Sequence, residues 1–103
     1  MLKIVNESNF SEEIGSGVVV VDFFADWCGP CKMLSPVLEE LQSELMDQVK
    51  IIKVNVDESS SLARQYSITN IPALVVLKDG NEVDRLVGFS PKQIIKENIE
   101  KSL

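Results

Sequence analysis

The hydrophobic residues of this chain follow two patterns, one typical of strands and one typical of helices. Residues 18–24 are apolar on both faces except at Asp22, which predicts a central strand covered on two sides. Further strands are predicted over residues 2–5, 50–56, 73–77 and 82–87. The last two form an antiparallel hairpin, because Asp79-Gly80 between them supplies the positive φ that a tight turn needs.

Helical spacing dominates the segment that follows the central strand. Its apolar stripe consists of Leu34, Val37, Leu38, Leu41 and Leu45, and it predicts the longest helix. The stripe continues past Pro36, which therefore indicates a kink and not an end. In the last helix, Ser90 is the expected N-cap and Pro91 the first helical residue, with Ile94, Ile95 and Ile99 facing inward. Shorter helices are predicted over residues 8–14 and 59–66.

The order of these elements predicts an α/β fold. A strand, a crossover helix and a parallel strand, followed later by a hairpin, give a central mixed five-stranded sheet with helices on both faces. The 103 residues contain no repeat or linker, so we expect a single domain over residues 1–103. Chemistry is expected beyond the carboxyl ends of the parallel strands.

Composition and charge narrow the possible functions. Ten Lys and Arg against 16 Asp and Glu give a net charge of -6, which is the wrong sign for a general nucleic-acid partner. We expect neither an export signal nor a membrane anchor, since no basic and apolar leader opens the sequence and no apolar run is long enough to span lipid. The expected location is cytoplasmic, where paired cysteines more often carry redox chemistry or bind metal than staple a fold.

The two cysteines lie directly after the central strand, in Trp27-Cys28-Gly29-Pro30-Cys31-Lys32. Residues three apart at the start of a helix have Cβ atoms roughly 5–6 Å apart, and a disulfide needs about 3.5–4.5 Å. A small local adjustment therefore lets the pair open and close. Closing so short a loop removes only about 2 kcal/mol of chain entropy, which makes a structural staple a poor explanation.

A helix N-terminus favours negative charge, so it lowers the pKa of the Cys28 thiol below the usual value of about 8.5. Pro30 suits the first helical turn and stiffens the loop between the sulfurs. Cys31 lies one turn further in and is expected to be more buried. Cys28 would attack an external disulfide, and Cys31 would resolve the mixed disulfide.

Two other interpretations of the cysteine pair remain open. A zinc or iron–sulfur half-site uses the same spacing, but the chain has no His and no third Cys, so such a site would need a dimer. Two inert core cysteines are also possible, although Gly29-Pro30 between them and Trp27 beside them do not suit a plain helix start. We expect no bound metal and no bound cofactor.

Residues 21–32 resemble the active-site signature of the thioredoxin family. The resemblance extends, in order and spacing, to Pro36, to Lys53 with Asp57, to Ile71-Pro72, and to residues 78–80 and 87–88. It covers essentially the whole chain and implies the thioredoxin fold. It also implies a protein-disulfide reductase that works through Cys28 and Cys31.

Asp22 and Lys53 gain possible roles from this resemblance. Burial in an apolar strand should by itself raise the pKa of Asp22, unless the residue lies at a strand bend or is paired with a cation. The resemblance implies a buried acid close to the inner thiol, which accepts the proton of Cys31. Lys53, on a neighbouring strand, would keep this acid partly charged.

The resemblance also implies a docking surface for the substrate. A trans Ile71-Pro72 bond is the default, because only about 5–6% of X-Pro bonds in folded proteins are cis. The family pattern instead implies a cis bond, which leaves the Ile71 backbone free to pair with an extended substrate. The expected surface consists of Trp27, Gly29, Pro30, Ile71, Pro72, Val87 and Gly88. Core packing is the alternative for its apolar members, although Trp27 is expected to be exposed.

Some residues depart from the family pattern. Phe24 stands where a second Trp is frequent, Ala73 where Thr is common, and Phe89 where the usual residue is small; Asn70 offers no charge. These differences leave the substrate undetermined, but they do not affect the exchange chemistry.

The sequence therefore predicts a monomeric reductant of protein disulfides. The resemblance implies disulfide-containing client proteins and a flavin-containing thioredoxin reductase that draws electrons from NADPH. Nucleic acid and membrane are not expected partners. One alternative is an exported oxidant or isomerase, but Gly29-Pro30 is the reducing type of pair within the resemblance. Another is an adaptor or structural subunit that uses the same fold with dispensable thiols.

Overall fold

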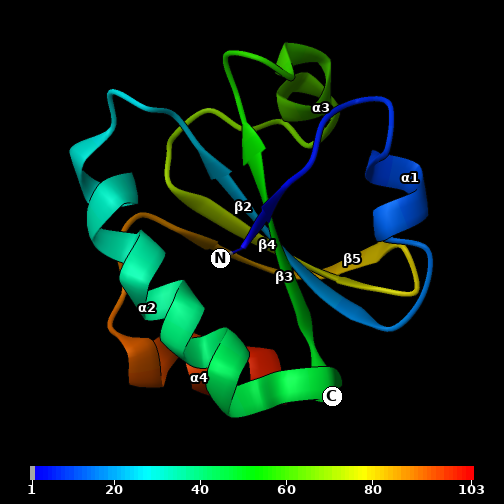
Figure 1. The fold of residues 1–103 in the computed structure, drawn as a ribbon, viewed down its shortest axis with the longest axis vertical. Helices are drawn as coiled ribbons and strands as arrows, with labels where there is room; N and C mark the ends of the chain where they lie inside the picture. The colour runs from blue at the N-terminus through cyan, green and yellow to red at the C-terminus, as the bar shows by residue number, and fades with distance from the viewer. Residues whose placement is uncertain (1) are drawn as a thin grey trace.

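The computed structural model describes residues 2–103. In chain order, its elements are β1 (Lys3–Ile4), α1 (Phe10–Glu13), β2 (Val18–Phe24), α2 (Gly29–Leu45), the 3-10 turn η1 (Met46–Gln48), β3 (Lys50–Asn55), α3 (Ser60–Gln65), β4 (Ala73–Lys78), β5 (Asn81–Val87) and α4 (Lys92–Glu100). The strands form one sheet in the order β1-β3-β2-β4-β5, with β2 at its centre (Figure 1).

The sheet is mixed. β2 pairs in parallel with β3 and antiparallel with β4, β1 is parallel to β3, and β4 and β5 form the predicted hairpin. The carboxyl ends of β2, β3 and β5 therefore lie at the same end of the sheet as the start of β4. The predicted five-stranded α/β architecture is confirmed, including the central position of the strand over residues 18–24.

Helices cover both faces of this sheet (Figure 1). Alternate residues of β2 pack against each helical layer. The layer of α2 and α4 is built from Leu34, Leu38, Leu41, Ile95 and Ile99, which cluster with Val18, Val20, Ile51, Leu74 and Val76. On the opposite face, Phe10 and Leu62 from α1 and α3 cluster with Val19, Val21 and Phe23. The alternation places Asp22 on the α2 face, between Val20 and Phe24.

The turn between β4 and β5 has the predicted chemistry. Asp79 and Gly80 have φ values of 49° and 85°, as a tight hairpin reversal requires. Asp79 also fastens the turn to the loop before β2, because its Oδ1 accepts from the Gly17 N–H at 2.8 Å and its own N–H donates to the Gly17 carbonyl at 3.0 Å.

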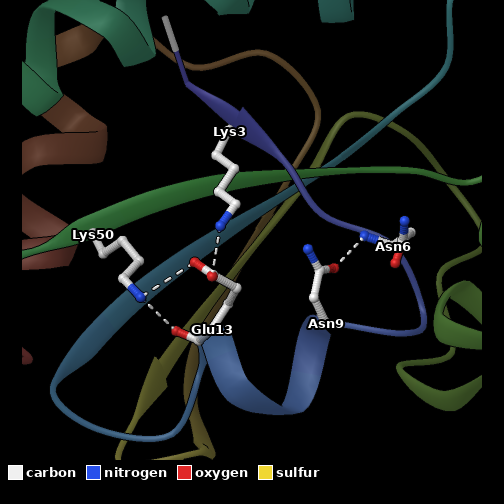
Figure 2. A network of polar contacts seen from close by, with 5 residues as sticks. All are labelled: Lys3, Asn6, Asn9, Glu13 and Lys50. Atoms are coloured by element: carbon white, nitrogen blue, oxygen red, sulfur yellow. Dashed lines mark hydrogen bonds and ion pairs between the residues drawn. The ribbon is translucent and has the colours of Figure 1, made fainter.

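A polar network ties α1 to the sheet (Figure 2). Glu13 accepts hydrogen bonds from Lys3 Nζ at 2.7 Å and from Lys50 Nζ at 3.4 Å, and Lys50 Nζ also donates to the Glu13 carbonyl at 2.8 Å. The bond from Lys3 is the main cause of the lowered pKa of Glu13. At the other end of α1, the Asn6 N–H donates to the Asn9 side chain at 2.9 Å.

Two predictions about the last helix are wrong. Pro91 is the N-cap, with ψ of 154°, and its carbonyl accepts from the N–H groups of Ile94 and Ile95, so the helix begins one residue later than predicted and Ser90 does not cap it. Ile94 is 45% exposed and does not face inward, because Ile95 and Ile99, four residues apart, occupy the inner face.

The other helices differ from prediction mainly at their ends. α1 is shorter than residues 8–14, since hydrogen bonds to Asn6 hold Ser8 in a turn before it. α3 lacks one residue at each end of residues 59–66. α2 continues through Pro36, as its apolar stripe predicts, and Pro36 itself is exposed.

Candidate active site at the carboxyl end of the central strand

Cys28 caps the helix that follows β2. The chain leaves the sheet at Phe24 and reaches Cys28, whose extended backbone, with φ of -88° and ψ of 110°, is suited to an N-cap. Its Sγ accepts the N–H of Cys31 at 3.2 Å, and Pro30 lies in the first helical turn. The amide donor and the helix N-terminus both stabilise negative charge on this sulfur in the reduced chain.

Cys28 and Cys31 are joined in a disulfide, with their Cα atoms 5.3 Å apart. Cys31 is 2% exposed and Cys28 is 4% exposed, so the expected difference in burial is small in the oxidised chain. The pair clusters with Phe24 and Ala25, and the half-buried Ile71 packs against it.

Trp27 projects into solvent beside the disulfide, with 71% of its surface exposed. Its indole N–H donates to Asp57 Oδ2 at 2.9 Å. Asp57 is held in turn by Asn55, whose Oδ1 accepts the N–H groups of Asp57 at 2.9 Å and Glu58 at 3.2 Å. Sequence reasoning missed this role of Asn55, although an Asn at a strand end is typical of a turn in which its side chain bonds the backbone two residues on.

The remaining residues of the predicted docking surface surround the same edge of the sheet. The Ile71-Pro72 peptide bond is cis, as the family pattern implies, and Pro72 is buried. The Gly88 N–H donates to the Pro72 carbonyl at 2.7 Å, which brings the end of β5 to the start of β4. Gly29 and Pro30 are exposed on the first turn of α2, and Val87 at the end of β5 and Phe89 just after it are exposed as well.

Asp22 lies within the regular part of β2, so the alternative of a position at a strand bend does not apply. Its register partners are Lys53 on β3 and Leu74 on β4. It is fully buried, and neither carboxyl oxygen has a hydrogen-bond partner among residues 2–103. Loss of solvation raises the pKa of Asp22 from 3.8 to about 7, and the positive charge of Lys53 opposes part of this rise.

Lys53 reaches toward α2 instead of forming a hydrogen bond with Asp22. Its Nζ donates to Ser35 Oγ at 2.8 Å and lies 4.4 Å from the centroid of the Phe24 ring. No sequence pattern indicates the contact between Ser35 and Lys53, because it joins a helix to a strand through the tertiary packing.

Comparison with known proteins agrees with the fold and the cysteine pair described above. A family model described as Thioredoxin matches residues 1–101. The chain belongs to the thioredoxin family. It is 50% identical to the thioredoxin of Bacillus subtilis (strain 168) over 97 residues, which cover 94% of this chain and 93% of that protein.

Relatives from other bacteria show the same level of similarity. The chain is 52% identical over 99 residues to the thioredoxin of Staphylococcus saprophyticus, with coverage of 96% of this chain and 95% of the relative. It is 50% identical over 101 residues to the thioredoxin of Chlamydia trachomatis serovar D, with coverage of 98% of both.

Thioredoxin-family membership and the Cys28–Cys31 pair together identify a thiol–disulfide oxidoreductase. It reduces protein disulfides by dithiol–disulfide exchange, in which the two sulfurs carry both electrons. Thioredoxins carry no bound cofactor. The alternative interpretation, an adaptor with dispensable thiols, is not favoured.

A pocket of about 330 Å³ lies beside the inner cysteine of this thioredoxin-family chain. Its lining consists of Phe24, Ala25, Asp26, Cys31, Lys32, Ser35 and Lys53. A larger pocket of about 400 Å³ lies at the other ends of β2 and α2, where Val18, Met46 and Lys50 are among its lining residues. Only the smaller pocket includes a residue of the disulfide.

The described residues 2–103 contain neither a metal-binding cluster nor a membrane-spanning helix. No group of three or more His, Cys, Asp or Glu side chains in this part of the chain is arranged to hold a metal ion. None of the helices described there combines the length and the apolar character that crossing a membrane requires.

Proposed function

We propose that Cys28 is the attacking thiol and Cys31 the resolving thiol of this reductase. The Cys28 thiolate attacks one sulfur of a substrate disulfide, and the other substrate sulfur leaves as a thiolate. Cys31 then attacks Cys28 Sγ, which forms the Cys28–Cys31 disulfide and releases the second substrate sulfur. Two electrons pass from the dithiol to the substrate. The observation that carries this assignment is the position of Cys28 Sγ at the helix N-cap, where it accepts the Cys31 N–H.

Asp22 is the proposed proton acceptor for Cys31. A group accepts and returns protons most efficiently when its pKa lies near the working pH, and burial raises the pKa of Asp22 to about 7. Its place on the α2 face of β2 supports the proposal, since Cys31 belongs to that helix. Lys53 keeps Asp22 partly ionised, so the carboxylate can take up the thiol proton.

The residues around the disulfide form the proposed substrate-docking surface. Ile71 precedes the first paired residue of β4, so its backbone lies outside the sheet ladder and can pair with an extended substrate segment. The proposed surface contains Trp27, Gly29, Pro30, Ile71, Pro72, Val87 and Gly88. Its side chains are weakly polar, which suits segments of many different client proteins.

We further propose a cytoplasmic monomer whose residues 1–103 fold as a single domain. A flavin-containing thioredoxin reductase that uses NADPH would regenerate the dithiol. Family membership supports a reductase and disulfide-containing clients as partners. The continuous five-stranded sheet supports a single folded unit.

The assignment of the cysteines is tested by reduction of insulin disulfides with dithiothreitol as the electron donor. The native chain should accelerate the reaction, whereas Cys28→Ser should return it to the uncatalysed rate. Reduced Cys31→Ser, mixed with insulin after removal of dithiothreitol, should accumulate a covalent mixed disulfide at Cys28, detected by mass spectrometry. Equal rates for the native and Cys28→Ser chains would contradict the proposal.

A further inference from the structure

The ionisation of the buried Asp22 carboxyl is influenced by the positive charge of Lys53, although the two side chains form no hydrogen bond. Both of its oxygens lack a hydrogen-bond partner among residues 2–103. Lys53 is the neighbouring residue on β3, and its ammonium group is hydrogen-bonded to Ser35 instead. The effect of Lys53 on Asp22 therefore acts through space, and its strength depends on where the ammonium group is held.

Two side chains hold that ammonium group. Ser35 Oγ accepts a hydrogen bond from Lys53 Nζ at 2.8 Å, and the Phe24 ring lies beneath Nζ at 4.4 Å from its centroid. The Ser35 hydroxyl in turn donates to the Cys31 carbonyl at 3.5 Å. Ser35 thus connects the lysine on β3 to the helical turn that begins at the inner cysteine.

We propose that Ser35 is a positioning residue that keeps the Lys53 ammonium group close to Asp22 and thereby sets the ionisation of the proposed proton acceptor. This inference rests on the role proposed for Asp22 and deepens it. The hydrogen bonds of Ser35 join it to Lys53 Nζ and to the Cys31 carbonyl and not to either sulfur, so Ser35 acts on Asp22 through Lys53.

The surroundings of Asp22 leave Lys53 as the dominant charge. The register partner of Asp22 on β4 is the apolar Leu74, which clusters in turn with Ile95 of α4. On α2, Cys31 and Leu34 are uncharged in the oxidised chain. Asp26 and Lys32 line the pocket near Lys53 but are exposed to solvent, which screens their charges.

Removal of the Ser35 hydroxyl has a defined consequence. Lys53 is half-buried and borders the pocket, so without its acceptor the ammonium group gains hydration by turning toward the water there. It then moves away from Asp22 and stabilises the carboxylate less. The pKa of Asp22 should rise further above its already raised value, because an opposite charge favours the ionised form.

The direct test is a carbon-13 NMR titration of the Asp22 carboxyl in the oxidised protein. Ser35→Ala should raise the titration midpoint by about half a unit, part of the roughly 1–3 units that a nearby opposite charge supplies. Ser35→Thr keeps the hydroxyl and should restore the native midpoint. An unchanged or lowered midpoint in Ser35→Ala would overturn the proposal.

A second pair of variants separates positioning from a change in the helix itself. In a Lys53→Met background, Ser35→Ala should shift the midpoint no further, because the charge that Ser35 positions is absent. An equal shift in both backgrounds would overturn the proposal. Thermal unfolding shows whether each variant is folded, and Ala suits a helix interior, so Ser35→Ala should remain folded.

The pH profile of exchange distinguishes this inference from the proposed function on which it rests. If the profile depends on Asp22, Asp22→Asn should alter it, and Ser35→Ala should move its midpoint in the same direction as the NMR titration. If Asp22→Asn leaves the profile unchanged, the role of Asp22 in exchange fails. If Asp22→Asn alters the profile while the titration in Ser35→Ala stays native, the role of Ser35 alone fails.

Discussion

The indole N–H of Trp27 donates to Asp57 Oδ2 at 2.9 Å, and this bond links the loop before α2 to the turn after β3. It fixes an aromatic side chain that is 71% exposed. A large exposed side chain without such a bond would sample several rotamers and would have to be ordered when a substrate binds. Asp57 therefore holds one part of the proposed docking surface in place.

Asp57→Ala should reduce kcat/KM for a protein disulfide about fivefold, which corresponds to about 1 kcal/mol for one lost hydrogen bond. Reduction of a small aromatic disulfide should change less, because it needs less of the docking surface. Trp27 is the sole tryptophan in the chain, so its fluorescence anisotropy reports the gain in mobility. Glu58→Ala, at the exposed neighbouring carboxylate, is the matched control. Equal losses for the two variants would argue against the role of Asp57.

Asp22→Asn should stabilise the fold near neutral pH. The pKa of Asp22 is raised in the folded state from 3.8 to about 7, so the folded chain holds a proton that the unfolded chain has released between these pH values. The native free energy of unfolding therefore falls by about 1.4 kcal/mol per pH unit across this window, by about 4 kcal/mol in total, and levels off above it. The neutral Asn side chain does not titrate, so Asp22→Asn lacks this pH-dependent loss of stability.

Urea denaturation of the oxidised proteins at pH 4 and pH 8 measures the effect. The advantage of Asp22→Asn over the native chain should be larger at pH 8. Asp26→Asn provides the control, since Asp26 is exposed and does not carry the cost of burial. An advantage of Asp22→Asn that is the same at both pH values would contradict the raised pKa of Asp22.

Two glycines near the disulfide should respond differently to alanine. Gly88 has φ of 88°, whereas Gly29 lies in the first turn of α2, and a Cβ at either position meets no atom within 4 Å. Gly88→Ala should cost about 1–2 kcal/mol because of its backbone conformation alone. Gly29→Ala should be close to neutral or slightly stabilising. Thermal unfolding of both variants checks the difference, and an equal loss of stability at Gly29 would show that the positive φ of Gly88 is not decisive.

Leu38 should be among the positions most sensitive to truncation. It is fully buried in the cluster between α2, α4 and the sheet. Leu38→Ala should lower the free energy of unfolding by about 2–5 kcal/mol, measured in urea. Met33→Ala lies on the same helix with Met33 62% exposed, and it should change stability by less than about 0.5 kcal/mol. Similar losses for the two would show that Leu38 does not anchor the helix.

Strong local patterns made much of the fold predictable. The apolar run of β2, the leucine stripe of α2 and Asp79-Gly80 in the hairpin each specify one local structure, and all three are present. The position of the cysteine pair follows from the same patterns, because the pair lies just after a buried strand and therefore at the carboxyl end of the parallel strands. The cis Ile71-Pro72 bond came from the family resemblance alone, since the residues themselves favour trans.

The contacts that shape the site depend on distances that a sequence pattern does not contain. Ser35 and Lys53 meet because α2 packs against β3, and no local spacing in the sequence encodes that packing. The inward orientation predicted for Ile94 is wrong because three isoleucines in one short helix do not reveal which two share its inner face. The predicted start of α4 lies one residue too early because Ser90 and Pro91 both suit a helix N-terminus.

β2 is hydrogen-bonded on both sides, and all of its residues are buried. Its amides should therefore be among the slowest in the protein to exchange with deuterated water, because no fraying at an outer strand exposes them. Asp22 lies on this strand, so its peptide N–H reports opening of the whole sheet, while its carboxyl proton must exchange through smaller motions beside α2. The proton-acceptor role proposed for Asp22 thus requires proton exchange at a place where the backbone itself hardly ever opens.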